Sequence, residues 1–233
     1  MATYHFPSNL YDERHGHFMR ITATPSNWQG GGFSSNVDTF ILPMPVGDKS
    51  YLYRQAHSYA ELKLSRAAAG IPGMADYASA AGTIAALAGT PINPMLEVIY
   101  ENTNLRTFSY SFLFAPESPK ESQDVESICR RMRFHAAPTM TDNAFVQGLF
   151  MIGPSKFKID FQTLVNGQWK PNTDASPTIP RLYDGVIDDI VVNYAPANGI
   201  FSTFSNGYPV AVELGISFRE TRIIDKNLIN KGY

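Results

Sequence analysis

Residues Thr107–Phe114 read TFSYSFLF, and this segment carries the strongest pattern in the chain. Aromatic side chains stand at every second position: Phe108, Tyr110, Phe112 and Phe114. Successive side chains of a β-strand point to opposite faces of the sheet, so a period of two places all four rings on one face. Burying each ring contributes about 1.5–3 kcal/mol. We therefore predict a central strand of a β-rich core.

An amphipathic helix is predicted shortly after this strand. Ser118 is expected as its N-cap, Pro119 as its first helical residue and Glu121 as the third. Arginines gather near its end, as the helix dipole favours, and Pro138 is expected to end it. Apolar side chains recur at the i, i+3, i+4, i+7 spacing of one helix face: Val125, Ile128, Cys129 and Met132.

Other segments with strand-like patterns lie on both sides of this unit. Asn166-Gly167 and Asn206-Gly207 are typical of tight turns between strands. About six to nine strands with one confident helix indicate a mainly β (α+β) fold, a β-sandwich or barrel. The further predicted strands are 18–24, 37–42, 97–102, 157–161, 186–194, 200–204 and 210–218.

Residues 50–91 differ in composition from the rest of the chain. Ala56, Ala60 and Leu64 recur at helical spacing, and alanine then dominates as far as Ala88. We predict an Ala-rich helical insertion of one or two short helices, within a single domain that spans residues 1–233. An alanine face buries little area, so we expect a neighbour, such as another subunit, to stabilise it.

The amino-acid composition excludes several classes of function. The 233 residues include 19 basic and 21 acidic side chains, giving a formal net charge of -2. This balance argues against a protein whose main task is to grip nucleic-acid phosphates, although it suits a passive channel. A single cysteine excludes an intrachain disulfide framework. No signal-peptide pattern and no apolar run of about 18 residues is present, so we expect a soluble protein assembled inside a cell.

Candidate catalytic and metal-binding residues form no convincing site. His15 and His17 could lie on one face of an extended segment, but a polar loop is the favoured interpretation. Cys129 lies on the apolar helix stripe and is expected to be a buried small hydrophobe. No phosphate loop, G-x-S-x-G or H-E-x-x-H motif occurs. We expect no enzyme activity, metal or cofactor, and a solvated edge or turn for the acidic residues Asp184, Asp188 and Asp189.

Arg106 immediately precedes the aromatic strand and allows two interpretations. It could be a plain surface arginine, which is the favoured one. It could also be a core or inter-subunit ion-pair residue, for example with Glu97.

Ten short segments, in their order and spacing, resemble the family of myophage baseplate tail-tube cap and tube-initiator proteins. The resemblance covers most of the chain, whereas the alanine-rich part matches only in character. The segments are FPSNL (6–10), FMRI (18–21), ILPMP (41–45), NPMLE (93–97), LRTFSYSF (105–112), FHAAP (134–138), PSKF (154–157), VNYAP (192–196), GYPV (207–210) and SFRET (217–221).

The resemblance implies a tail-tube-like fold and a structural role. In that family six copies form a ring whose sheets join into one barrel, located between the baseplate hub and the first tube ring. DNA would pass through the lumen without specific binding, and no membrane is involved. The protein would be part of the virion, in the tail baseplate, and would be assembled in the host cytoplasm. Arg106, Glu97 and the aromatic strand would then have structural or interface roles.

Two alternatives remain open. The first is a tail-tube shaft subunit that polymerises by stacking on itself. The second is a carbohydrate- or receptor-binding β-sandwich module, which would need exposed aromatic side chains. For the ring, the expected contact segments are the loops 30–35 and 166–178 and the alanine-rich residues 67–89.

Overall fold

The computed structural model describes residues 2–10, 16–25, 37–47, 50–63, 96–140, 151–171, 179, 181–196 and 199–233. Its fold is mainly β, as predicted. The chain divides into two compact units, a larger one formed by Met1–Arg54 and Leu105–Tyr233 and a smaller one formed by Gln55–Asn104. None of the described helices is long and apolar enough to cross a membrane.

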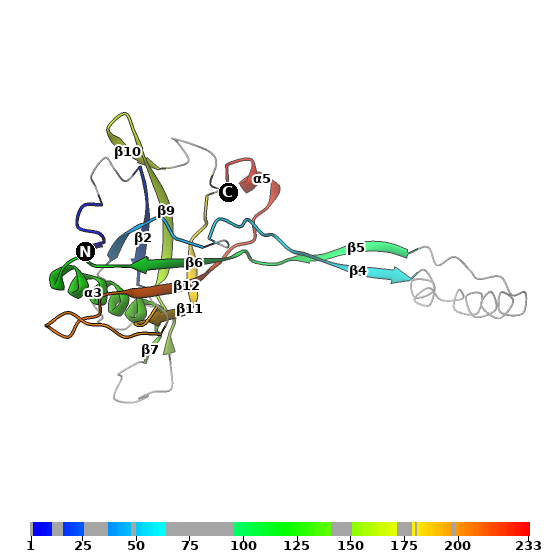
Figure 1. The fold of residues 1–233 in the computed structure, drawn as a ribbon. Coiled ribbons are helices and arrows are strands. Elements are labelled where there is room, and N and C mark those ends of the chain that lie inside the picture. Colours follow the sequence, from blue (N-terminus) through cyan, green and yellow to red (C-terminus); the bar gives the residue numbers. More distant parts are fainter. Residues whose placement is uncertain are drawn as a thin grey trace, which may run out of the picture. The chain divides into compact units, whose positions relative to one another are not determined.

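An eight-stranded sheet forms the larger unit (Figure 1). The strand order is β1-β3-β2-β9-β11-β12-β6, and β10 pairs with β9. The β1–β3 pair is parallel and the other pairs are antiparallel. The strands are β1 (Ala2–His5), β2 (His17–Thr24), β3 (Asp38–Pro43), β6 (Thr107–Phe114), β9 (Lys156–Val165), β10 (Gln168–Pro171), β11 (Gly185–Asn193) and β12 (Val212–Glu220).

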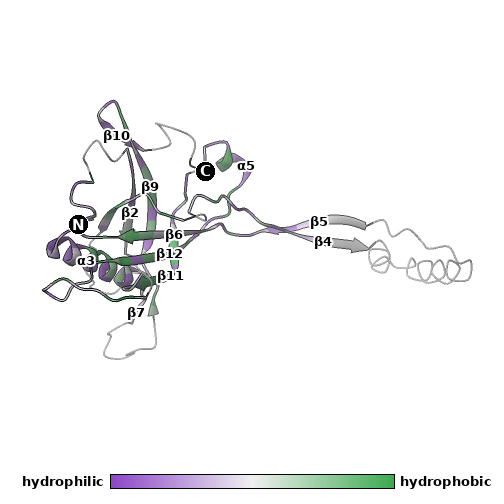
Figure 2. Cartoon of the chain, viewed as in Figure 1, coloured by the Kyte–Doolittle hydropathy of each residue, from purple (hydrophilic) through white to green (hydrophobic). Residues whose placement is uncertain are grey.

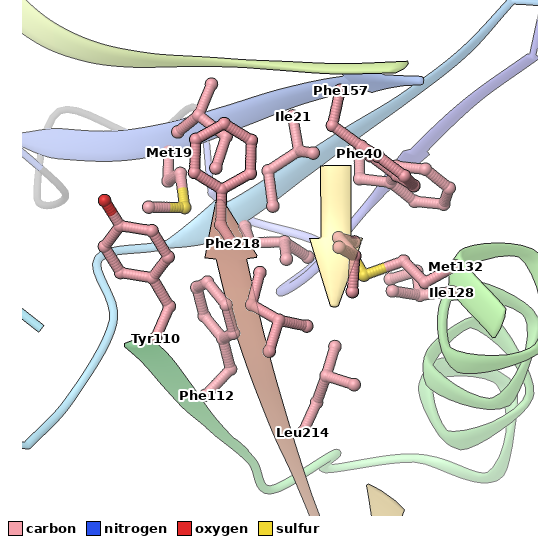
Figure 3. Close-up of a cluster of buried hydrophobic side chains, with 14 of the residues drawn as sticks. Met19, Ile21, Phe40, Tyr110, Phe112, Ile128, Met132, Phe157, Leu214 and Phe218 are labelled. Atoms are coloured by element: carbon pink, nitrogen blue, oxygen red, sulfur yellow. The ribbon is translucent and has the colours of Figure 1, made fainter. Parts of the chain in front are cut away.

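The sheet has a corner between β9 and β11. These two strands share one register pair, Gly185 with Phe157, whereas β2 and β9 pair along eight positions. The part before the corner (β1, β3, β2, β9) and the part after it (β11, β12, β6) contribute to one hydrophobic core. Figure 3 shows side chains from β2, β3 and β9 meeting those of β6 and β12. The structure therefore confirms the predicted mainly β fold and shows that both parts of the sheet share one core.

The aromatic strand is β6, and its four rings are buried as predicted. Each ring faces an apolar partner on β12, since Phe108 pairs with Phe218 and Phe112 pairs with Leu214 in the register. The predicted apolar face of residues 212–218 is buried as well. The alternating apolar residues of β6 and those of β12 thus lie on the same, core-facing side of this strand pair.

The predicted helix is α3 (Pro119–Ala136). The Ser118 hydroxyl caps it by accepting a hydrogen bond from the Glu121 N–H (3.2 Å). The Glu121 carboxylate in turn accepts from the backbone N–H groups of Ser8 and Glu117. The helix ends one residue before its C-cap, Ala137. In Figure 2, α3 alternates between hydrophilic and hydrophobic segments, and its predicted apolar stripe is buried: Val125, Ile128, Cys129 and Met132.

Both predicted Asn-Gly turns are present, the second with the Gly207 N–H donating to the Phe204 C=O (2.9 Å), but one strand predicted beside them is not. Asn166 (φ 52°) and Gly167 (φ 74°) form the tight β9–β10 turn, as predicted. The strand predicted at 200–204 is wrong, because the segment has only an isolated bridge between Thr203 and Pro209. Ile200 and Phe201 are exposed, so no buried apolar face holds this segment in a sheet.

The smaller unit contains a two-stranded antiparallel ribbon of β4 (His57–Lys63) and β5 (Leu96–Thr103). β5 confirms the strand predicted at 97–102. The helix predicted from Ala56 onward is wrong at its start, because Ala60 lies in β4 and pairs with Ile99. Cross-strand pairing thus outweighs the alanine spacing there. Residues 64–95, most of the predicted insertion, lie outside the described residues.

Three short elements complete the described structure. β7 (Thr139–Met140) and β8 (Met151–Ile152) form a second two-stranded pair. The short helix α5 (Lys226–Ile229) lies near the C-terminus and is capped by the Asp225 side chain.

Candidate assembly interface

The eight-stranded sheet ends at β1 on one side and at β6 on the other. β6 pairs with β12 along its inner edge. On its outer edge the described residues give one backbone hydrogen bond, from the Val46 N–H to the Ser111 C=O (2.7 Å). Sheet edges of this kind present backbone donors and acceptors to a further strand. The end at β6 is therefore a candidate contact surface.

A groove of about 570 Å³ lies on the outer face of β11, β12 and β6. Glu213 accepts a hydrogen bond from the Ser111 hydroxyl (3.1 Å) at its floor, and Asp189 contributes a second carboxylate. Most of the side chains across the three strands are short, and the groove combines its two carboxylates with small polar groups and with the exposed apolar side chains of Val46 and Val191. The remaining outward-facing residues on this floor are Ser109, Asn193, Gly215 and Ser217.

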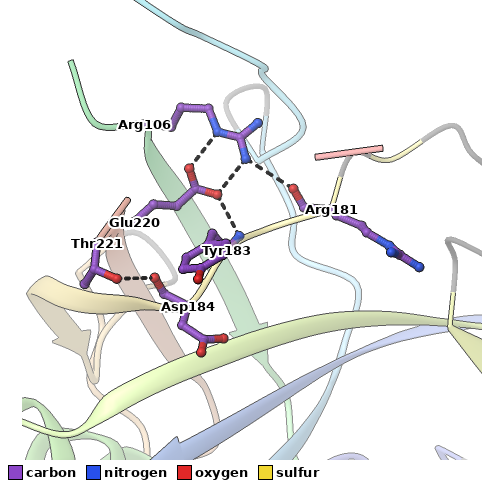
Figure 4. A network of polar contacts seen from close by, with 6 residues as sticks. All are labelled: Arg106, Arg181, Tyr183, Asp184, Glu220 and Thr221. Carbon is purple, nitrogen blue, oxygen red and sulfur yellow. Dashed lines mark hydrogen bonds and ion pairs between the residues drawn. The ribbon is translucent and has the colours of Figure 1, made fainter. Parts of the chain in front are cut away.

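Arg106 forms a buried ion pair with Glu220 (Figure 4). Arg106 Nε and Nη2 each lie 2.6 Å from one oxygen of the Glu220 carboxylate, and the two side chains are 1 % and 0 % exposed. The same carboxylate accepts from the Tyr183 N–H (2.8 Å). Burial alone would lower the pKa of Arg106, but the hydrogen bonds and charge of Glu220 raise it above its usual value. Arg106 therefore stays charged inside the fold.

The partner of Arg106 corrects one prediction. The surface interpretation is wrong and the core ion-pair interpretation is confirmed, with Glu220 as the carboxylate that the structure shows. Glu97 lies in β5, and its side chain is outside the described set. Glu220 follows the inward-facing apolar residues of β12 at the same spacing of two. A carboxylate at such a position could have been predicted from the sequence to be buried and to need a positively charged partner.

A second buried polar cluster joins β3, α3 and the start of β9. His135 Nε2 lies 3.1 Å from Asp38 Oδ2, and His135 Nδ1 lies 2.9 Å from Ser155 Oγ. Arg131 Nε and Nη2 also bind Asp38 Oδ2, at 2.8 and 2.5 Å. Burial would raise the pKa of Asp38, but the hydrogen bonds from His135 and Arg131 outweigh it, so this pKa is lowered.

This serine, histidine and aspartate have the order of a hydrolase triad, but their burial fits a structural role. Ser155 is 8 % exposed, and a nucleophile must be reached by its substrate. The Ser155 N–H also donates to the His135 C=O (2.9 Å), which ties the end of α3 to β9. Sequence reasoning missed the cluster because its members are far apart in the chain and follow no motif.

The other predicted site residues do not converge. His17 Nδ1 lies 3.0 Å from Thr163 Oγ1, and His15 is outside the described residues. Asp188 pairs with Arg219 (2.6 Å). Across the described ranges, no group of three His, Cys, Asp or Glu side chains could hold a metal ion. Cys129 is fully buried, as predicted, and this burial raises the pKa of its thiol to about 12.

The described end of the β4–β5 ribbon carries an exposed aromatic cluster. The rings of Tyr59 and Tyr100 meet at 6.0 Å in a T-shaped contact, and they are 56 % and 53 % exposed. Thr103 Oγ1 lies 2.5 Å from the Tyr100 hydroxyl and 2.8 Å from His57 Nδ1. Thr103 is thus hydrogen-bonded to Tyr100 and to His57, and the two tyrosine rings remain open to solvent.

Most of the predicted contact loops, 30–35, 67–89 and residues 172–178, lie outside the described residues. Residues 166–171 form the β9–β10 turn and β10. No protein-family model matches the sequence, and no curated protein matches it either. The function is therefore proposed from the sequence resemblance, together with the geometry of the described strands.

Proposed function

We propose that the chain is a structural baseplate protein of a contractile phage tail. It forms a hexameric ring that joins the baseplate hub to the tail tube and initiates tube polymerisation. The observation that carries this proposal is the open end of the sheet at β6, where one isolated hydrogen bond occupies the outer edge within the described residues. An edge strand is protected when a neighbouring copy pairs with it. A head-to-tail contact repeated by rotation closes into a ring.

The two carboxylates in the groove support the proposal that DNA passes through the ring without specific binding. Asp189 and Glu213 lie on the outer face of β11 and β12, among serine and glycine residues. Where this face borders the channel, the carboxylates repel phosphate and the short side chains leave room. DNA would then slide past without adhering, in keeping with the net charge of -2.

The energetics favour assembly on a template. A contact of about 1,500 Å², a little over half of it apolar, offers roughly 20 kcal/mol at about 25 cal/mol/Å². Association and loop ordering cost about 4–15 kcal/mol or more. The surplus is modest, so a free ring is marginal and the hub is expected to nucleate it.

The aromatic strand offers no surface to the carbohydrate-binding alternative, since its four rings face the core, so that alternative would have to use exposed rings such as Tyr59 and Tyr100. The shaft alternative uses the same ring contact but adds stacking of the chain on itself. The two roles are separated by what the purified chain forms alone.

The test is electron microscopy of the purified chain alone, with the hub protein, and with hub and tube proteins together. We expect single rings on the hub and tube growth from those rings. Leu113→Lys should reduce ring formation, whereas Ile200→Lys, also at an exposed apolar residue, serves as the control. Long filaments of the chain alone would indicate a shaft subunit. Failure to bind hub or tube, with no copy in tail particles, would contradict the proposal.

A further inference from the structure

We propose that Asn166 is a site of spontaneous deamidation through a cyclic imide, and that the fold protects a second turn asparagine, Asn206, from the same reaction. Each of them is followed by glycine, whose missing side chain leaves its backbone nitrogen open to the asparagine amide. Asparagine is among the thermolabile residues of proteins. A third such pair, at 198–199, lies partly outside the described residues. The inference does not depend on the proposed function.

The reaction at Asn166 needs only solvent water as co-reactant. The Gly167 backbone nitrogen loses its proton to water and attacks Cγ of Asn166. The new C–N bond closes a succinimide ring, and the side-chain nitrogen takes up a proton and leaves as ammonia. Water then opens the ring at either carbonyl. One product is aspartate, and the other is isoaspartate, in which the main chain runs through the former side chain and is longer by one methylene group.

The β9–β10 turn leaves the reacting groups of Asn166 and Gly167 accessible (Figure 1). Both residues are exposed, and a Cβ atom built on Gly167 would meet nothing within 4 Å. Among the described residues, no hydrogen bond engages the Gly167 N–H or the Asn166 side-chain amide. The nitrogen can therefore lose its proton, and the amide can turn toward it, without breaking a hydrogen bond of the fold.

The backbone conformation of this turn also permits ring closure. Asn166 has φ 52° and Gly167 has φ 74°, the left-handed pair of a type I′ hairpin turn. A type II′ turn keeps the positive φ of its first residue and differs by a rotation of the peptide between the two residues. This rotation brings the Gly167 nitrogen to the side of the Asn166 side chain, while Val165 and Gln168 can stay paired.

The same two residue types are held differently at Asn206 and Gly207. These residues are exposed as well, so exposure does not separate the two sites. The Gly207 N–H donates to the Phe204 C=O (2.9 Å), and Asn206 Oδ1 accepts from the Tyr208 N–H (3.3 Å). Attack by the Gly207 nitrogen breaks the first hydrogen bond, and rotation of the Asn206 amide breaks the second. The fold therefore slows the reaction at Asn206.

Isoaspartate at position 166 alters the hairpin that carries it. Trp169 of β10 pairs with Leu164 of β9 across a two-residue turn. The Trp169 ring packs against Phe18, with 4.6 Å between the ring centroids, beside a small buried cluster. Two-residue turns of this kind have a narrowly defined backbone geometry, which a longer main chain does not fit. The modification therefore loosens the pairing of β10 and the packing on Phe18.

Peptide mapping by mass spectrometry tests the inference on the full chain, incubated in mildly alkaline buffer with and without urea. We expect Asn166 to convert at least about tenfold faster than Asn206 in the folded chain, because two hydrogen bonds must break at the slower site. In urea, where neither turn exists, the two sites should convert at similar rates. Equal rates in the folded chain, or the same ratio in urea as in the folded chain, would overturn the inference.

Two variants at the same position supply the controls. Asn166→Gln closes its ring far more slowly, so conversion should vanish at 166 and stay unchanged at Asn206; rapid conversion of this variant would contradict the imide route. Asn166→Asp supplies the charge of the products with a main chain of normal length. Chains with isoaspartate should exchange the amides of β10 at least about tenfold faster than this variant, with unchanged protection of α3. Equal exchange in β10 would contradict the loosening of the hairpin.

Discussion

Arg106 shows how much one buried charge can matter. Arg106→Met leaves the Glu220 carboxylate buried with only the Tyr183 N–H beside it. Loss of one partner of a buried ion pair typically costs about 3–5 kcal/mol. We expect a reduction of this size in the free energy of unfolding, measured by urea denaturation. The double variant with Glu220→Met should recover much of the loss, because no lone charge remains buried.

The exposed pair Arg20–Asp160 provides the comparison. Arg20 Nη2 lies 3.2 Å from Asp160 Oδ2, and the Arg20 side chain is 41 % exposed. Surface pairs contribute about 0–1 kcal/mol, so Arg20→Met should change stability by less than about 1 kcal/mol. An Arg106→Met variant as stable as the Arg20→Met variant would contradict the buried pairing.

Asp38 should make the fold sensitive to acid. Because its pKa is lowered in the folded chain, the unfolded chain binds the proton more tightly. The stabilisation is present above the unfolded pKa of about 3.9 and is lost as pH falls through the folded value. We expect the urea midpoint to decrease below about pH 4, and Asp38→Asn to make this decrease shallower. Equal slopes in both proteins would exclude Asp38 as a source of the pH dependence.

The sheet corner depends on Gly185, at the first residue of β11. A Cβ atom added there would lie 2.3 Å from the Arg219 carbonyl oxygen and 2.5 Å from the Phe218 ring. Gly185→Ala should therefore lower stability by about 1–3 kcal/mol, because backbone or core must shift. Thermal denaturation can measure this against Gly215→Ala on β12. The Cβ of that variant meets its nearest neighbour at 3.8 Å, so we expect little loss.

Elements with local signals could be predicted from the sequence, and those without them could not. Thr107–Phe114 and α3 follow from period-two and helical spacing and from the cap at Ser118. The spacing of Ala56 and Ala60 was misleading, because small residues carry little apolar area and cross-strand pairing decides the conformation. The contacts of Arg106 with Glu220 and of His135 with Asp38 join residues 114 and 97 positions apart. Such contacts follow from topology, which no local pattern specifies.

At the scale of the whole molecule, the two units should be separable. The buried side chains of the main core all belong to the larger unit. The ends of the smaller unit meet where the Asn104 N–H donates to the Ala56 C=O (2.9 Å), so a linker of about four glycine and serine residues can join Arg54 to Leu105. We expect this excision of Gln55–Asn104 to leave cooperative unfolding intact and to shift Tm by less than about 4 °C. A shortened chain that no longer unfolds cooperatively would show that the larger unit needs the ribbon to fold.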